Sequence, residues 1–363
     1  MTVRFGNITF SDWVSLEYEG GFTDTFIFHI DAMNGLPPFG YRPLLQRMAA
    51  RLKNKRRGAS LWIQVDSPGE WYLMEVKNSL SRGFKVPHVV TETGQIPEWV
   101  AFSRRPDLWN YKCAEPPAAK TRPDLVSINE LRCMRVLARI KQGLVSEIAS
   151  LADLDQALVT TTIGSLVKKK LLFQTPELEN ARMAGPYWQL TRSGLSYTMR
   201  RWNAPPRLDF TDRREGDPGD IRTPHRHVSR MWPSWLRSAY PRTEIWMGWS
   251  EVGIPGISVR PDALAWGRIQ GFETLFWLEV GDDHKGRDEI KKDTHTRLEK
   301  ALLFCRRTGA RLVYAQLSPN WVQKAARWGV MDLPGDAAVI MGDRKIFGKL
   351  PMVEWGKVMC LHK

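Results

Sequence analysis

Apolar residues recur with the period of an α-helix in three successive stretches in the middle of the chain. The first is Asn129–Ile140, the second Val145–Leu151 and the third Gln156–Lys170. Asp153 or Asp155 can cap the third helix, because a side chain before a helix accepts hydrogen bonds from its first free N–H groups. The pattern therefore predicts three short helices in close succession.

The helices are followed by two short runs of strand-forming residues. Leu171–Phe173 and Tyr187–Leu190 flank the polar segment Gln174–Pro186, which is typical of a turn. Thr191 then stands where it can cap another helix. Three helices followed by a two-stranded hairpin are the element order of a winged helix-turn-helix, which we assign to residues 124–203.

The third helix combines small hydroxyl side chains with a lysine-rich end. If its apolar residues face inward, we expect its hydroxyls to face outward, near base edges in a DNA major groove, and its lysines to lie near phosphates. Arginines of the hairpin and of the segment after it would add phosphate contacts. The predicted DNA-binding residues are Thr160, Thr161, Ser165, Lys168, Lys169, Lys170, Arg182, Arg200 and Arg201. Alternatively, the module binds protein, and its lysines only complement the helix dipole.

The N-terminal part, residues 1–113, predicts a small α/β domain. Phe26–Ile30 and Leu61–Val65 are typical of strands, and Pro43–Lys53 between them has helical spacing. We expect Trp71–Val76 to be a strand that forms a hairpin with Leu61–Val65. A proline-rich linker follows this domain.

The C-terminal part, residues 222–363, follows a second, arginine-rich linker. The pattern predicts a helix, three strands, a long amphipathic helix and a further strand. These are His225–Leu236, Glu244–Trp249, Ile257–Trp266, Thr274–Val280, Glu289–Arg307 and Leu312–Gln316. The last helix and strand form an α/β crossover. The fold class is therefore α/β, or α+β, with three domains.

One acidic pattern in the N-terminal domain suggests chemistry. Asp66, Glu75 and Lys77 resemble the metal-binding pattern of PD-(D/E)XK nucleases, in which carboxylates hold Mg²⁺ and a lysine helps to activate water. However, Asp66 lies in the expected turn, and Glu75 follows it closely. An exposed, charged strand edge is the favoured interpretation.

A second such pattern lies in the C-terminal domain. Arg260-Pro261-Asp262-Ala263-Leu264-Ala265 and Phe276-Trp277-Leu278-Glu279-Val280, followed by a helix and a strand, resemble the core of PD-(D/E)XK nuclease-like folds. A winged helix followed by these two motifs and a lysine-bearing helix is similar to the replication-relaxation family of plasmid and mobile-element proteins. The resemblance covers roughly residues 125–318 and leaves the N-terminal domain unexplained.

The resemblance implies that Asp262 and Glu279 would bind Mg²⁺ in an active nuclease and that a lysine two residues after the glutamate would activate water. Gly281 stands at that position. Lys285, Lys291 or Lys292 could replace the lysine, so Asp262, Glu279, Lys285 and Lys292 are the candidate catalytic residues of an active enzyme. A carboxylate pair without its lysine favours a scaffold that binds DNA without cleaving it. Alternatively, Asp262 opens a strand and Glu279 pairs with Arg260 or Lys292.

Histidines in the C-terminal domain suggest a further metal site. His225, His227, His284 and His295, with Asp282 and Asp283, match no standard ligand spacing. We therefore expect them to be exposed polar residues.

Composition agrees with a DNA partner. The chain of 363 residues has 53 basic and 39 acidic residues and a formal net charge of +14, which favours an anionic partner. The four cysteines form no CxxC pair, so we expect free thiols in a reducing compartment. The chain shows no signal peptide and no apolar run long enough to span a bilayer, so we expect a cytoplasmic protein without a membrane partner.

These patterns together predict a protein of a plasmid, phage or other mobile element that binds double-stranded DNA in replication, transposition or transfer. Its nuclease-like domain would be inactive, and DNA binding would require no cofactor. One alternative is a Mg²⁺-dependent endonuclease. Another is an interaction module that works with other proteins of a larger nucleoprotein complex.

Overall fold

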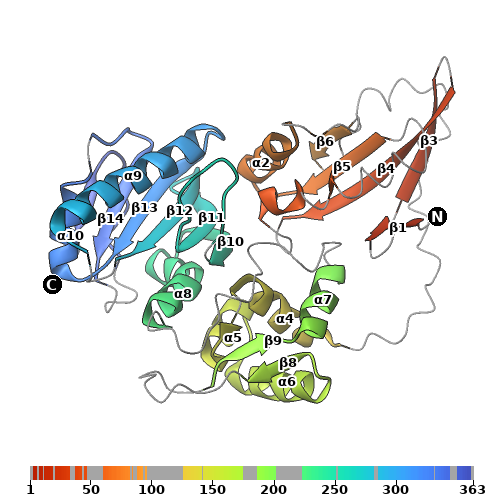
Figure 1. The fold of residues 1–363 in the computed structure, drawn as a ribbon, viewed down its shortest axis with the longest axis horizontal. Helices are drawn as coiled ribbons and strands as arrows, with labels where there is room; N and C mark the ends of the chain where they lie inside the picture. The colour runs from red at the N-terminus through yellow and green to blue at the C-terminus, as the bar shows by residue number, and fades with distance from the viewer. Residues whose placement is uncertain are drawn as a thin grey trace. The chain divides into compact units, whose positions relative to one another are not determined.

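A computed structural model divides the chain into two compact units, Met1–Ser127 with Ser196–Pro206 and Ile128–Leu195 with Arg207–Lys363 (Figure 1). The C-terminal part and the winged helix from Ile128 to Leu195, expected as separate domains, therefore share one unit. The structure describes residues 3–5, 8–10, 12–18, 21–32, 37–42, 45–46, 60–81, 84, 88–92, 95, 126–140, 142–174, 186–201, 223–250, 252–281, 285–330, 332–343 and 350–360.

The N-terminal unit contains a four-stranded sheet in the order β3-β4-β5-β6 and a separate pair, β1-β2. Strands β3 and β4 are antiparallel, whereas β4, β5 and β6 are parallel. Most of the helix expected at Pro43–Lys53 lies outside the described residues. The strands are β1 Val3–Phe5, β2 Ile8–Phe10, β3 Asp12–Tyr18, β4 Gly21–Asp31, β5 Ser60–Asp66 and β6 His88–Glu92; a short 3-10 helix, η1, spans Pro38–Gly40.

The prediction that Trp71–Val76 forms a hairpin with Leu61–Val65 is wrong. Residues Glu70–Ser81 form a helix, α2, which connects the parallel strands β5 and β6. Parallel neighbours cannot be joined by a tight turn, so a crossover element is required. The buried residues Trp71, Val76 and Leu80 lie on the covered side of this helix. Glu75 is also buried in α2, and Lys77 lies in the same helix, so the expectation that these residues form an exposed, charged strand edge is wrong.

The predicted helices and strands of the winged helix are confirmed. They are α4 Ile128–Ile140, α5 Val145–Ala152, α6 Gln156–Lys168, β8 Leu172–Gln174, β9 Trp188–Leu190 and α7 Arg192–Arg201. Asp155 caps α6 by accepting from the N–H groups of Ala157 and Leu158. The Thr191 hydroxyl oxygen accepts from Gly194 N–H at 3.0 Å and caps α7. A short strand that the sequence did not indicate, β7 Gln142–Gly143, adds a third member to the small sheet.

The C-terminal part is built on a six-stranded sheet in the order β10-β11-β12-β13-β14-β15. Strands β10, β11 and β12 are antiparallel to their neighbours in this group, and β12 to β15 are parallel. Along the chain, β10, β11 and β12 are followed by α9 and β13, which confirms the predicted order strand, strand, strand, helix, strand. The strands are β10 Glu244–Ser250, β11 Ala263–Ile269, β12 Phe272–Val280, β13 Arg311–Leu317, β14 Ala337–Gly342 and β15 Val358–Cys360. Strand β11 begins later than expected, after Pro261.

Helices cover both faces of this sheet. Trp232 and Leu236 of α8 (Thr223–Ala239) pack with Phe276 and Leu278 of β12 on one face. On the other face, Phe304 of α9 contacts Trp277 edge to face. The helices there are α9 Arg287–Arg306 and α10 Asn320–Arg327 (Figure 1). Because both faces are covered, β12 and β13 are buried along nearly their whole length.

Candidate functional site

Helix α6 exposes part of the predicted DNA-binding set. Thr160 and Thr161 are exposed, and their hydroxyls donate to the carbonyls of Gln156 and Ala157 at 2.8 and 3.0 Å. These bonds use the hydroxyl hydrogens, so the oxygens face solvent as acceptors. Lys168 and Lys170 are also exposed, and α6 carries no acidic residue. We call Thr160, Thr161, Lys168 and Lys170 the α6 face.

Two predicted members of this set face the protein instead. The Ser165 hydroxyl donates to Glu130 Oε1 at 2.7 Å, and the Lys169 ammonium lies 2.7 and 2.8 Å from the two oxygens of the same carboxylate. Glu130 belongs to α4 and is 4% exposed. The outward position expected for Ser165 is therefore wrong, because a buried carboxylate on the neighbouring helix requires donors.

The predicted arginines lie beyond what the structure describes in detail. Arg182 is outside the described residues, and the side chains of Arg200 and Arg201 in α7 are as well. The proposed phosphate contacts of these three arginines stay predictions. The turn between α5 and α6 is short, because α5 ends at Asp153 in a left-handed conformation (φ 53°) and Asp155 already caps α6.

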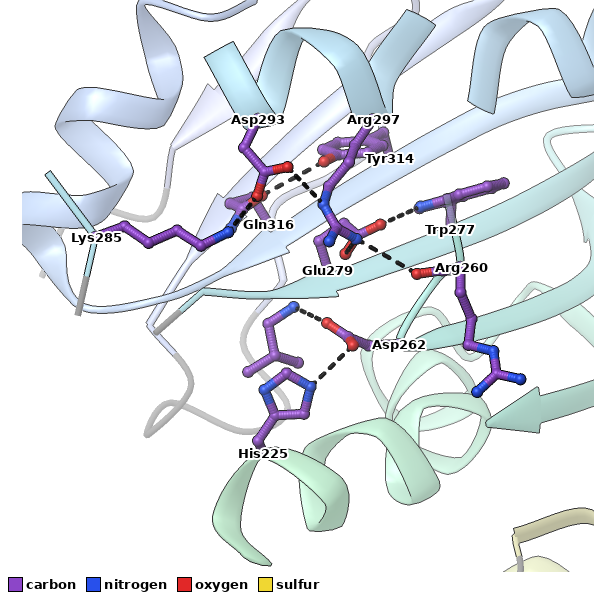
Figure 2. Close-up of polar contacts among 11 residues, drawn as sticks. His225, Arg260, Asp262, Trp277, Glu279, Lys285, Asp293, Arg297, Tyr314 and Gln316 are labelled. Carbon is purple, nitrogen blue, oxygen red and sulfur yellow. Dashed lines mark hydrogen bonds and ion pairs between the residues drawn. The ribbon is translucent and has the colours of Figure 1, made fainter. Parts of the chain in front are cut away.

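The two acidic residues of the C-terminal domain meet at the end of their strands. Pairing of Ala263 with Leu278 places Asp262 opposite Glu279. Asp262 Oδ2 accepts from Val280 N–H at 2.7 Å, and Oδ1 lies 2.8 Å from His225 Nε2 of α8 (Figure 2). Asp262 thus joins the end of β12 to the start of α8. The sequence identified this pair but not its histidine partner.

Glu279 is bound by a cation that the sequence did not indicate. Arg297 of α9 donates from Nη1 to Glu279 Oε2 at 2.6 Å, and Trp277 Nε1 donates to Oε1 at 2.7 Å (Figure 2). Arg297 also donates to Asp293, which in turn accepts from Lys285 at 2.8 Å. We call Asp262, Glu279 and Arg297 the carboxylate site, together with the side chains that contact them: His225, Trp277, Asp293 and Lys285.

Burial and mutual charge determine the ionisation of this site. Burial and the charge of Asp262 raise the pKa of Glu279, while Arg297 and the Trp277 hydrogen bond lower it, and the net direction is upward. Burial opposes the charge of Arg297, but Glu279 and Asp293 outweigh it and raise the arginine pKa. The guanidinium is therefore held as a cation beside Glu279 and Asp293.

The position expected for a catalytic lysine has no space for one. A β-carbon at Gly281 would lie 2.7 Å from Ser318 Cβ and 2.9 Å from Gln316 Nε2. Of the substitute lysines, Lys285 bonds to Asp293 rather than to Asp262 or Glu279, and Lys292 is exposed on α9. The alternative pairing of Glu279 with Lys292 or Arg260 is also wrong, since its partner is Arg297.

The carboxylate site is paired within the protein. Each oxygen of Asp262 and Glu279 contacts a protein nitrogen. Arg297 already supplies a positive charge beside Glu279. Among the described residues, no group of three or more His, Cys, Asp or Glu side chains is placed to hold a metal.

The histidines differ from the exposed polar residues that we expected. His225 and His227 lie in α8, and their side chains are only 14% and 18% exposed. His227 contacts the carboxylate of Glu147, a residue of α5 in the winged helix. Arg230 donates two hydrogen bonds of 3.1 Å to the same carboxylate. Only His295, 4.0 Å from Glu299, fits the expectation; His284, Asp282 and Asp283 lie outside the described residues.

Glu147, His227 and Arg230, which we call the Glu147 cluster, attach the winged helix to the C-terminal part. Glu147 and Arg230 are 1% and 2% exposed, so the pair is buried between α5 and α8. Burial alone would raise the pKa of Glu147, but the charge of Arg230 and the hydrogen bonds from His227 and Arg230 lower it below its ordinary value of 4.5. The carboxylate is therefore ionised and binds the two elements together.

Comparison with protein-family models and with curated proteins gives no match for this chain. Within the part of the chain that the structure describes, no helix combines the length and apolar character that crossing a membrane requires.

Proposed function

We propose that this protein binds double-stranded DNA through the α6 face and serves a plasmid, phage or other mobile element in replication, transposition or transfer. The observation that carries the proposal is the α6 face itself. It presents Thr160, Thr161 and Lys168 on the second helix of a helix-turn-helix and Lys170 in the turn just after it, without an acidic residue in α6. Hydroxyl acceptors can meet amino groups of bases, and lysines can meet phosphates.

Net charge supports the same proposal. A chain with a net charge of +14 attracts a polyanion over long distances, which raises the rate of encounter with DNA. The assignment to a mobile element rests on the resemblance to the replication-relaxation family. The assignment of DNA as the ligand rests on the α6 face.

The proposal includes a carboxylate site that organises the domain and does not cleave DNA. Asp262 and Glu279 are the acidic residues of the two motifs on which the nuclease resemblance rests, and Arg297 supplies a positive charge beside Glu279. Gly281 leaves no space for the missing lysine. A site of this kind supports the sheet end and α9 without activating water.

Selection from a pool of random duplexes tests the proposal. The full chain is expected to enrich a defined sequence, and Thr161→Ala is expected to relax the preference at one or two base positions. A matched variant, Ser165→Ala, changes a hydroxyl on the same helix that faces Glu130, so it should leave the preference unchanged. Absence of any enriched sequence would contradict sequence-specific binding.

The same binding measurements distinguish this proposal from the alternative that the protein is an interaction module of a larger nucleoprotein complex. If isolated protein bound duplexes only weakly and without preference but co-purified with a partner, the winged helix would act within a larger nucleoprotein complex. Tight, selective binding by the isolated chain supports the proposal instead.

A further inference from the structure

Helix α10 exposes a row of aromatic and basic side chains. Trp321 and Trp328 are 40% and 62% exposed, although large aromatic residues are usually covered. Lys324 and Arg327 are exposed on the same helix, while Val322, Ala325 and Ala326 face the core. We call Trp321, Lys324, Arg327 and Trp328 the α10 face.

The spacing of these residues places both rings on one side. Positions seven residues apart in a helix lie two turns apart, and the position three residues on lies between them. Lys324 therefore stands between Trp321 and Trp328. At a rise of about 1.5 Å per residue, the Cα atoms of the two tryptophans are separated along the axis by about 10 Å, so each ring can take a different base.

Neighbouring elements add charge and connect this helix to the carboxylate site. A β-carbon at Gly329 would lie 2.3 Å from the carbonyl oxygen of Lys291, so the end of α10 packs directly on α9 beside an exposed lysine. At the other end, Val322 Cγ1 lies 3.0 Å from the β-carbon position of Gly281, two residues after Glu279. The core side of α10 therefore packs beside Gly281, at the end of the strand that carries Glu279.

From this arrangement we propose that the α10 face binds single-stranded DNA. Indole rings stack on unpaired bases, and the cations between and beside them bind phosphates. A duplex does not offer its base faces, so exposed tryptophans favour an unpaired strand. A protein partner fits less well, because covering both rings would bury Lys324 at the centre of the interface, where lysine is depleted.

Binding of a labelled oligothymidine to the full chain, followed by fluorescence anisotropy, tests this site. Each of Trp321→Ala and Trp328→Ala is expected to weaken binding about tenfold, as the loss of one stacked base predicts. Trp321→Phe should retain most of the affinity because it keeps a flat ring. Lys324→Gln should lower the dependence of log affinity on log salt by about 0.7.

Leu303→Ala is the matched control, since Leu303 is a 54% exposed apolar residue of α9 outside the α10 face. It should leave oligothymidine binding unchanged. The site does not depend on the α6 face, so the tryptophan variants should keep their affinity for duplex DNA. Thr161→Ala with Lys168→Ala should weaken duplex binding and leave binding of the oligothymidine unchanged.

Several results would overturn the proposal. The first is that the unaltered chain does not bind oligothymidine. The second is that the double variant, Trp321→Ala with Trp328→Ala, binds it as tightly as the unaltered chain. The third is that Thr161→Ala with Lys168→Ala loses oligothymidine binding while the tryptophan variants keep it. A change of oligomeric state in the double variant would show a protein interface and would also overturn it. If that variant melts at a lower temperature, Lys324→Glu with Arg327→Glu replaces it, and unchanged binding by this charge reversal has the same consequence.

Discussion

The α6 face and the carboxylate site both carry residue types that DNA-processing proteins use, but they differ in how the charge is balanced. Lys168 and Lys170 face solvent, whereas each oxygen of Asp262 and Glu279 contacts a donor within the chain. A charge that is already paired inside the protein has little to offer a ligand. The proposed division into a binding face and a supporting site therefore follows from how each charged residue is paired, and not from its type.

Removing the internal cation should have the largest effect. Arg297→Ala would leave Glu279, only 5% exposed, without its ion-pair partner. Loss of one partner of a buried pair typically costs about 3–5 kcal/mol, so we expect the free energy of unfolding to fall by about that amount. Urea denaturation measures the change.

Two further variants make this result specific. Lys292→Ala changes an exposed cation on the same helix and should alter stability by less than about 0.5 kcal/mol. Replacing both partners, Glu279→Leu with Arg297→Leu, should recover part of the loss, because no charge is left buried. Equal stability of Arg297→Ala and the unaltered chain would refute the structural role of this arginine.

The Glu147 cluster should give the next largest effect. Glu147→Gln removes the charge that faces Arg230 and is expected to cost about 2–3 kcal/mol at neutral pH. The folded-state pKa of Glu147 lies below its ordinary 4.5, so its stabilisation is complete above that value and is lost as pH falls through the folded pKa.

The difference between Glu147→Gln and the unaltered chain should therefore shrink as the pH falls below about 4.5. Urea denaturation of both proteins across this range measures it. A difference that stays constant with pH would mean that the carboxylate charge does not hold α5 to α8.

Adding a side chain at Gly281 should lower the stability by a smaller amount. Gly281→Ala places a β-carbon 2.7 Å from Ser318 Cβ, and such overpacking typically costs about 1–3 kcal/mol. Gly335→Ala is the control, because nothing lies within 4 Å of its β-carbon position. Thermal unfolding compares the two. If Gly281→Ala and Gly281→Lys were both as stable as the control, a lysine could have been accommodated there.

The smallest expected effect is a difference between Lys168 and Lys169 in how their removal changes the salt dependence of duplex binding. Lys168→Ala removes an exposed charge of the α6 face and should reduce the dependence of log affinity for duplex DNA on log salt by about 1. Lys169→Ala should change this slope less, because its ammonium is bound to Glu130 at 2.7 Å. Titrations at several salt concentrations measure both slopes. Equal slopes for the two variants would show that Glu130 does not withhold Lys169 from DNA.

Local patterns predicted much of the fold. The helices α4, α5, α6 and α9 follow from apolar spacing and from caps such as Asp155, because these signals lie within a few residues of one another. The segment Trp71–Val76 failed because a short, aromatic-rich apolar run suits either a strand or a buried helix. Its place between the parallel strands β5 and β6 is what determines that the segment is a helix.

The partners of the site residues were harder to predict. Ser165 and Lys169 face Glu130, which is 35 and 39 positions away in the chain. Arg297 meets Glu279 across the packing of α9 on the sheet, 18 positions away. The sequence indicated which residues carry charge, but the pairing depends on tertiary contacts that no local pattern contains. The α10 face also became visible only once burial separated its two sides.

The central claim is that the chain binds DNA through the α6 face and that the carboxylate site does not cleave it. The most direct test incubates the purified full chain with supercoiled and linear DNA, with Mg²⁺ or Mn²⁺ and with EDTA, and scores nicking and mobility shift on the same samples. We predict a shift without nicking, reduced by Thr161→Ala with Lys168→Ala. Metal-dependent nicking that disappears in Glu279→Ala, or the absence of any shift, would contradict the account.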